Sequence, residues 1–93
     1  MEPGKVISAL NSEMRREILK IISEEPMTVI QVLEELKRRR FEVKYRETVY
    51  RALEKLLDAG LVEKYYDQEK GLCYRIKAKL IAIDLANSTI ETQ

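Results

Sequence analysis

Apolar residues in the first part of the chain recur at the spacing of amphipathic helices. The earliest clear set stands at i, i+4, i+7 and i+8, on one helix face: Met14, Ile18, Ile21 and Ile22. Ser12 is a suitable N-cap for this helix. Because a proline disfavours helical geometry in the residue before it, Pro26 predicts that the helix ends within residues 23–25. Upstream, a shorter helix with Pro3 near its start is expected on the apolar residues Val6, Ile7 and Leu10.

Two more helices follow before residue 60. Thr28 and Gln31 have the spacing of a capping box, which predicts a helix over residues 29–39. Its apolar stripe comprises Val29, Val32, Leu33 and Leu36. The next helix is the clearest in the sequence, with Gly60 placed as its C-terminal cap. Its buried face comprises Val49, Leu53 and Leu56, flanked by Ala52 and Leu57.

The pattern changes to extended segments after Gly60. Residues 61–66 are rich in strand formers, residues 67–71 form a turn cluster, and residues 72–76 are extended again, which predicts a β-hairpin. For residues 78–86, alternating apolar positions favour a strand, while good helix formers leave a helix as the alternative. The expected fold class is therefore α+β: a three-helix core followed by a β-hairpin wing, the order of a winged helix-turn-helix.

Length and composition indicate one domain spanning residues 1–93. Of the 93 residues, 45% are hydrophobic and 35% are charged, so the chain can bury a core beneath a strongly solvated surface. This composition disfavours disorder, and the longest apolar stretch, residues 80–83, is too short to span a membrane. The start of the chain has no signal-peptide pattern, so we expect a cytoplasmic protein with no membrane partner. Cys73 is the single cysteine, which excludes an internal disulfide.

Basic residues are concentrated in the middle of the chain. Residues 37–55 carry eight basic and three acidic side chains, a net charge of +5, although the whole chain has a formal net charge of only +1. The flanking residues 1–36 and 56–93 carry net charges of −3 and −1. A basic segment of this kind is typical of a protein with a polyanion partner such as nucleic acid. A solvated helix face is the alternative interpretation.

Two stretches of the sequence resemble those of ArsR-like winged-helix regulators: SEMRREILKIISEEPMTVIQVLEELKRR and RETVYRALEKLLDAGLVEKYYDQEKGLCYRI. The resemblance covers residues 6–77, and its portion TVYRALEKL is also similar to the ferric-uptake-regulator family. It implies a DNA-binding transcription regulator that occupies an operator on double-stranded DNA. It also implies a recognition helix over residues 46–59 and a β wing over residues 62–76. A helix suits this task because it fits the major groove, where base pairs present distinct donor and acceptor patterns.

The resemblance indicates nine side chains as candidates for DNA contact. In the recognition helix they are Arg46, Glu47, Thr48, Tyr50, Arg51 and Lys55, of which Lys55 would reach only the DNA backbone. In the wing they are Lys64, Lys70 and Arg75, although Asp67 and Glu69 nearby would repel phosphate. Helix geometry turns Glu54 outward as well, and it leaves a packing role open for Tyr50.

Residues beside these candidates have structural interpretations. Tyr45, four residues before the buried Val49, is expected to pack rather than to contact DNA. It also departs from the family pattern, which often has Ser or Thr at the start of the recognition helix. The arginine run at residues 38–40 is expected to solubilise a helix end and to favour its dipole, with DNA contact as the alternative.

Metal sensing and catalysis are both disfavoured. Many regulators of these families bind metals through Cys and His clusters, whereas this chain has no His and one Cys. We therefore expect no metal and no cofactor. We expect Cys73 to be a small packing residue, with a redox switch or a disulfide across a dimer as the alternatives. The absence of His removes the commonest general base, and no phosphate loop, nucleophile elbow or dinucleotide fingerprint is present, so the chain is not expected to be an enzyme.

Apolar residues at both ends of the chain predict a homodimer. They exceed the needs of a minimal three-helix core, and they comprise Val6, Ile7, Leu10, Leu80, Ile81, Ile83 and Leu85. We expect residues 1–11 and 78–93 to contribute to dimerisation. Two-fold symmetry then predicts a near-palindromic operator. The alternative function is a winged-helix protein-interaction module in a larger assembly, without base-specific DNA binding, and the acidic residues of the wing favour it.

Overall fold

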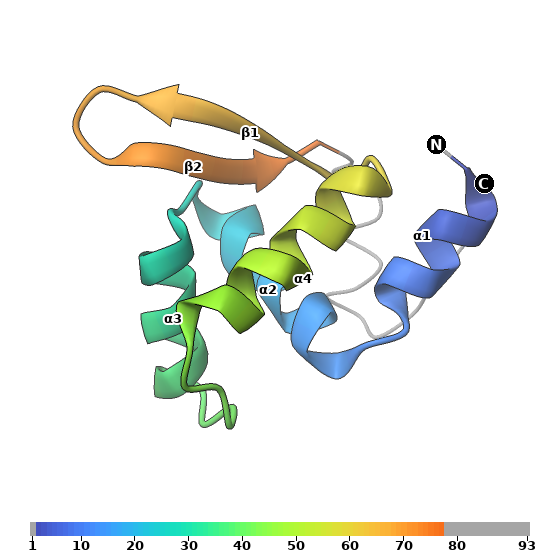
Figure 1. Ribbon diagram of the computed structural model, residues 1–93, viewed down its shortest axis with the longest axis horizontal. Coiled ribbons are helices and arrows are strands. Elements are labelled where there is room, and N and C mark those ends of the chain that lie inside the picture. The colour runs from blue at the N-terminus through green and yellow to red at the C-terminus, as the bar shows by residue number, and fades with distance from the viewer. Residues whose placement is uncertain (1, 78–93) are drawn as a thin grey trace.

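The computed structural model describes residues 2–77, which form four helices followed by a two-stranded antiparallel hairpin. The helices are α1 (Pro3–Leu10), α2 (Glu13–Glu24), α3 (Val29–Arg38) and α4 (Arg46–Asp58), and the strands are β1 (Val62–Asp67) and β2 (Gly71–Ile76). α1 and the tip of the hairpin lie at opposite ends of the molecule (Figure 1). The predicted α+β winged helix-turn-helix is confirmed, with the hairpin as its wing. The strand or helix expected over residues 78–86 lies outside the described residues.

Side-chain caps fix the starts of α2 and α3. Ser12 Oγ accepts a hydrogen bond from the Arg15 backbone N–H at 3.2 Å. At α3, Thr28 Oγ1 accepts from the Gln31 backbone N–H at 3.2 Å, and Gln31 Oε1 accepts from the Thr28 N–H at 3.0 Å. Each cap satisfies a donor that the helix itself leaves unpaired. Both predicted helix starts are therefore confirmed, together with the capping interactions that specify them.

α4 ends in the left-handed turn that its glycine predicts, and α3 ends in the same kind of turn without a glycine. Gly60 has φ 76°, and the Leu61 N–H donates to the Leu56 carbonyl at 3.0 Å. At the end of α3 the corresponding residue is Arg40, with φ 66°. A residue with a Cβ in this conformation crowds the following carbonyl, which costs about 1–2 kcal/mol. Arg40 is therefore a position of backbone strain.

α1 is held in place by two arginines of the next helix. Arg15 donates to the Ala9 carbonyl at 2.7 Å and to the Ser8 carbonyl at 3.2 Å, and Arg16 donates to the Leu10 carbonyl at 2.6 Å. These carbonyls belong to the last turn of α1, where a helix leaves carbonyls without intrahelical donors. The Ser8 carbonyl also accepts from the Asn11 N–H at 3.2 Å. The arginines therefore join α1 to α2 and complete the end of α1.

The apolar stripes predicted from the sequence form the core. The buried residues include Ile18, Ile21, Ile22, Val32, Leu33, Leu36, Val49, Ala52, Leu53 and Leu56. Leu10 also lies in this core, with an exposed fraction of 2%, rather than at the dimer interface where the sequence places it. The reason is that α1 packs against α2 and α4 as a further layer of the same core. Ile7 remains 60% exposed, and Val6 packs partly against the core.

The wing is closed at its tip by an aspartate. Asp67 lies opposite Gly71, and its Oδ1 accepts backbone hydrogen bonds from Lys70 at 3.0 Å and from Glu69 at 2.8 Å. These two N–H groups favour the charged carboxylate, so they hold the pKa of Asp67 below its ordinary value. Asp67 therefore organises the turn that presents Lys70.

A third extended segment joins the wing, and the sequence pattern did not predict it. Met27, between α2 and α3, pairs with Tyr74 of β2: the Tyr74 N–H donates to the Met27 carbonyl at 2.8 Å, and the Met27 N–H donates back at 3.1 Å. A single paired residue has no periodicity, so no local pattern marks it. The bridge ties the wing to the start of α3. Cys73, next to Tyr74, is 1% exposed and is confirmed as a packing residue.

Arg39 joins α2 to the end of α3. Its guanidinium lies 2.5 Å from Glu17, 3.5 Å from Glu35 and 3.6 Å from Glu24. The hydrogen bond to Glu17 is the largest of the contributions that raise the pKa of Arg39 above its ordinary value. The arginine run at residues 38–40 therefore does more than solubilise a helix end, because Arg39 holds two helices together.

Candidate nucleic-acid interface

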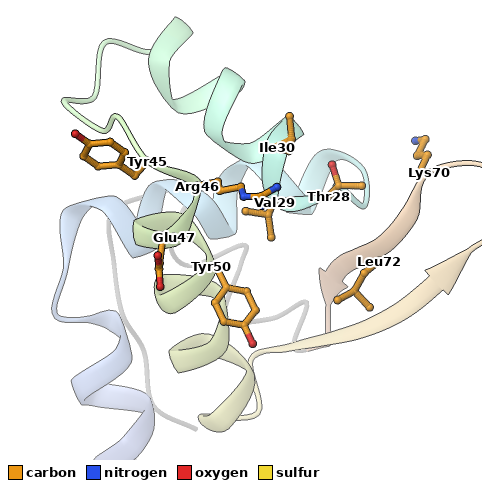
Figure 2. Close-up of a pocket in the computed structure, with 9 residues that line it drawn as sticks. All are labelled: Thr28, Val29, Ile30, Tyr45, Arg46, Glu47, Tyr50, Lys70 and Leu72. Atoms are coloured by element: carbon orange, nitrogen blue, oxygen red, sulfur yellow. The ribbon is translucent and has the colours of Figure 1, made fainter.

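An open groove of about 770 Å³ lies between the first turns of α3, the first turns of α4 and the wing (Figure 2). We call it the helix–wing groove. Nine residues line it: Thr28, Val29, Ile30, Tyr45, Arg46, Glu47, Tyr50, Lys70 and Leu72. Three segments that are far apart in the sequence therefore meet at one surface.

Four of the nine predicted contact residues meet in the helix–wing groove: Arg46, Glu47, Tyr50 and Lys70. Arg46 is the first residue of α4, and Lys70 lies in the turn of the wing. Both are exposed, and neither has an ion-pair partner within residues 2–77. Figure 2 shows Arg46 extending from the start of α4 towards Val29 and Lys70 on the wing, so the two cations come from different elements.

The other predicted residues of α4 are exposed outside the groove: Thr48, Arg51 and Lys55. Arg51 Nη2 lies 3.6 Å from Glu47 Oε1, and both side chains are largely exposed. A surface pair at i, i+4 is worth about 0.3–0.5 kcal/mol and is screened by salt, so it leaves Arg51 available to another anion. DNA contact by these three residues stays a prediction.

Glu54 links α4 to both strands of the wing. Its Oε2 accepts hydrogen bonds from the Tyr74 hydroxyl at 2.8 Å and from Lys64 Nζ at 3.1 Å. Burial of Tyr74, its hydrogen bond to Glu54 and the negative charge of Glu54 together raise the pKa of Tyr74 above its ordinary range. The prediction that Glu54 faces outward is wrong, because the wing folds back over it. Lys64 is engaged in the same contact, and its binding to DNA stays a prediction.

Arg75 lies on the other face of the hairpin. Its Nε is 2.7 Å from Glu63 Oε1, and its guanidinium is 4.5 Å from the centroid of the Tyr65 ring. Glu63 and Tyr65 alternate with Lys64 along β1, so they point to the opposite side of the strand. Arg75 does not line the helix–wing groove, and DNA contact by Arg75 stays a prediction.

Five lining residues were not selected from the sequence: Thr28, Val29, Ile30, Tyr45 and Leu72. The expectation that Tyr45 packs is wrong, since it precedes α4 and is 69% exposed. Ile30 stands off the apolar stripe of α3, and an apolar residue outside the stripe is the signal that could have identified it. Leu72 shares its strand face with the buried Tyr74, so the alternation of the strand predicts that Leu72 is buried, whereas it is exposed.

Two helices begin at the helix–wing groove, and both present backbone N–H groups there. The first N–H groups of α3, at Val29 and Ile30, have no acceptor within the helix. α4 begins without a side-chain cap, because the residue before it is Tyr45. The positive ends of the two helix dipoles favour an anion such as phosphate. Glu47 opposes this effect as the one carboxylate among the lining residues.

A metal-binding cluster and a membrane-spanning helix are both absent from the part of the chain that the structure describes. Residues 2–77 contain no group of three His, Cys, Asp or Glu side chains placed to hold a metal ion. None of the helices in this region has the length and apolar character needed to cross a membrane.

The arrangement of α3, α4 and the wing defines a winged helix-turn-helix fold. Among solved structures, HlyU from Vibrio cholerae N16961 has a similar fold, with a TM-score of 0.72 over 95% of this chain and 94% of that chain. The two proteins are 16% identical in sequence, so the likeness concerns the fold alone. No model of a known protein family matches the sequence, and no curated protein matches it.

Proposed function

We propose that this chain is a DNA-binding transcription regulator that occupies an operator through α4 and the β wing. The observation that carries the proposal is the helix–wing groove with Arg46 and Lys70 among its lining residues. Cations on two different elements suit a duplex, because a helix reads base edges in the major groove while neighbouring elements hold phosphates. The similarity to HlyU supports the fold on which the proposal rests.

In this proposal the first turns of α4 enter the major groove. The side chains that approach base edges or adjacent phosphates are Arg46, Glu47, Thr48, Tyr50 and Arg51, and Lys55 reaches the backbone. The wing contacts the backbone or the minor groove through Lys64, Lys70 and Arg75. The free N–H groups at the start of α3 add donors for a phosphate. Affinity then falls with salt, because each neutralised phosphate releases counterions.

Binding to labelled duplexes at fixed salt tests the proposal. We expect the chain to select an operator from a library of random duplexes and to bind it about a thousandfold more tightly than random DNA. Arg46→Ala should weaken operator binding. Lys20→Ala makes the same charge change on α2, outside the groove, and should leave binding unaltered. Equal affinity for every duplex, or no binding to any, would contradict the proposal.

We further propose that the regulator is a cytoplasmic homodimer that needs no metal or cofactor and has no catalytic activity. Ile7 supports dimerisation, since it is exposed on α1 at the end of the molecule opposite the wing tip (Figure 1). The apolar residues Leu80, Ile81, Ile83 and Leu85 of the sequence add to this argument. A two-fold axis would set the two copies of α4 on half-sites about 34 Å apart, so the operator should be near-palindromic.

A protein-interaction module is the second candidate, and the apolar character of the groove favours it. The exposed side chains that suit a protein partner are Ile30, Tyr45, Tyr50 and Leu72. In addition, two wing cations, Lys64 and Arg75, are already paired with carboxylates of the same chain. A gel-shift titration against random and genomic DNA separates the two candidates, because an interaction module binds neither.

A further inference from the structure

Large apolar side chains that face solvent are concentrated in the helix–wing groove. Among the residues that the structure describes, six such side chains are exposed: Ile7, Ile30, Tyr45, Tyr50, Tyr66 and Leu72. Four of these six line the groove. Single exposed apolar residues are common on protein surfaces, whereas several on one concave surface indicate a binding site. The groove therefore needs a ligand that is apolar in part.

Tyr50 and Leu72 lie on facing walls of the groove. Figure 2 shows Tyr50 on α4 and Leu72 on β2, with space between them. Their exposed fractions are 43% and 42%, so neither is covered by the fold. The lining also includes Arg46 and Lys70, which suit phosphates or guanine rather than an apolar group. The ligand should therefore combine negative charge with an apolar group.

Duplex DNA has this combination wherever it contains thymine. The C5-methyl group of thymine projects into the major groove, where apolar side chains contact it, and phosphates lie on both sides of that groove. We propose that the helix–wing groove recognises the thymine methyl group, with the Tyr50 ring as the specificity-determining contact and Leu72 closing the far side. The inference rests on the proposed DNA binding and adds the base that the apolar surface selects.

The spacing along α4 sets where the thymine lies. Tyr50 follows Arg46 by four residues, so the two side chains lie on the same helix face about 6 Å apart along the axis. Because a recognition helix lies at an angle to the DNA axis, side chains three or four residues apart contact bases about one or two steps apart. The selected operator should therefore have a thymine about one or two base pairs from the base that Arg46 contacts, in each half-site.

Deoxyuridine provides a test because it differs from thymidine only by the missing methyl group. Each thymine of a selected operator is replaced in turn by deoxyuridine, and Kd is measured by fluorescence anisotropy at fixed salt. At one position per half-site we expect the Kd to rise about fourfold, the change that corresponds to removing one buried methyl group. Tyr50→Ser should bind the thymine and deoxyuridine duplexes equally, while Tyr50→Phe, which keeps the ring, should still distinguish them.

Tyr66→Ser is the matched control. Tyr66 is an exposed tyrosine of the wing that does not line the groove, so this variant should keep the fourfold preference for thymine. Tyr50 is partly exposed, and its truncation leaves the buried core intact. Leu72→Ser is a second variant on the opposite wall, and it should reduce the preference for thymine without removing it.

Two results would overturn the inference, and they are distinguishable. If the chain selects an operator but binds it equally with deoxyuridine at every position, the methyl contact does not exist and DNA binding stands. If no duplex is enriched from the library, both the proposed function and the inference about thymine fail. The apolar groove is then better explained by a protein partner.

Discussion

The hydroxyl of Tyr74 on β2 donates a 2.8 Å hydrogen bond to the carboxylate of Glu54 on α4, twenty residues earlier in the chain. Lys64 of β1 donates to the same oxygen at 3.1 Å. One carboxylate therefore joins the helix to both strands of the wing. Any ligand that contacts α4 and the wing together depends on this junction, because it fixes the angle between them.

Replacing Tyr74 with Phe should lower the free energy of unfolding by about 1–2 kcal/mol at neutral pH, because a partly buried carboxylate loses a donor. The pKa of Tyr74 is raised in the folded state above its ordinary value of 10.0. The stabilisation is therefore fully present below about pH 10 and is lost as the pH rises further. We expect the difference between the wild type and Tyr74→Phe to shrink by up to about 1.4 kcal/mol per pH unit there.

Urea unfolding between about pH 7 and pH 11 measures this difference. Tyr66→Phe is the control, since Tyr66 is 75% exposed and its substitution should change the free energy of unfolding by less than about 0.5 kcal/mol. A constant difference for Tyr74→Phe across the alkaline range would show that Tyr74 titrates as it does in the unfolded chain.

Arg40→Gly should raise the free energy of unfolding. The substitution relieves the crowding of a Cβ at φ 66°, worth about 1–2 kcal/mol, and loses about 0.5–1 kcal/mol to the greater freedom of glycine in the unfolded chain. The net gain should be about 0.5–1 kcal/mol in thermal or urea unfolding. Arg38→Gly is the matched control inside α3, and it should destabilise by a similar amount. If both variants changed the free energy of unfolding in the same direction, the assignment of strain to Arg40 would be contradicted.

Arg39→Met should destabilise the fold by about 1–3 kcal/mol, because it leaves the carboxylates of Glu17, Glu24 and Glu35 without their shared partner. Methionine keeps most of the apolar length of the side chain, so the destabilisation measures the ion pairs. Arg38→Met removes the same charge from a side chain that is 71% exposed, and it should change stability by less than about 0.5 kcal/mol. Chemical denaturation of both variants at the same salt concentration makes the comparison, and equal destabilisation would refute the role given to Arg39.

Arg46 and Lys70 should give different kinds of binding defect. Arg46→Ala should lower operator affinity and relax the preference at one base position per half-site, since a bidentate arginine–guanine contact is worth about 1–3 kcal/mol. Lys70→Ala should weaken operator and random DNA alike, and it should reduce the slope of log affinity against log salt by about 0.9 for each phosphate that the lysine no longer neutralises. Arg51→Ala should resemble Arg46→Ala. Full affinity and unchanged base preference in both arginine variants would mean that α4 does not read DNA.

Ile7→Asp should prevent the proposed dimerisation. Ile7 is 60% exposed on α1, so the charge does not enter the core of the subunit. Sedimentation velocity at micromolar concentration should show a dimer for the wild type and a monomer for the variant, with unchanged far-ultraviolet circular dichroism. A wild-type chain that stays monomeric both free and on DNA would rule out the two-fold arrangement.

Local signals in the sequence specify most of the secondary structure and of the core. Ser12, the Thr28–Gln31 capping box and Gly60 act within about one helical turn, and the apolar stripes follow from the helical period, so neighbouring residues suffice to specify them. The tip of the wing is equally local, since Asp67 bonds to residues two and three positions later. The fold class followed from the order of these elements.

The packing of distant segments determines which polar and apolar side chains share a surface. The helical period of α4 predicts that Glu54 faces solvent. In the structure the wing packs over it, because Glu54 accepts a hydrogen bond from Tyr74, twenty residues later in the chain. Tyr45 lies before α4, and its exposure depends on how the connection leaves α3. Leu72 shares a strand face with the buried Tyr74, and Ile30 stands off the apolar stripe of α3. Both line one groove because three separate segments converge there. Burial at such positions is set by contacts between distant segments, which local periodicity does not encode.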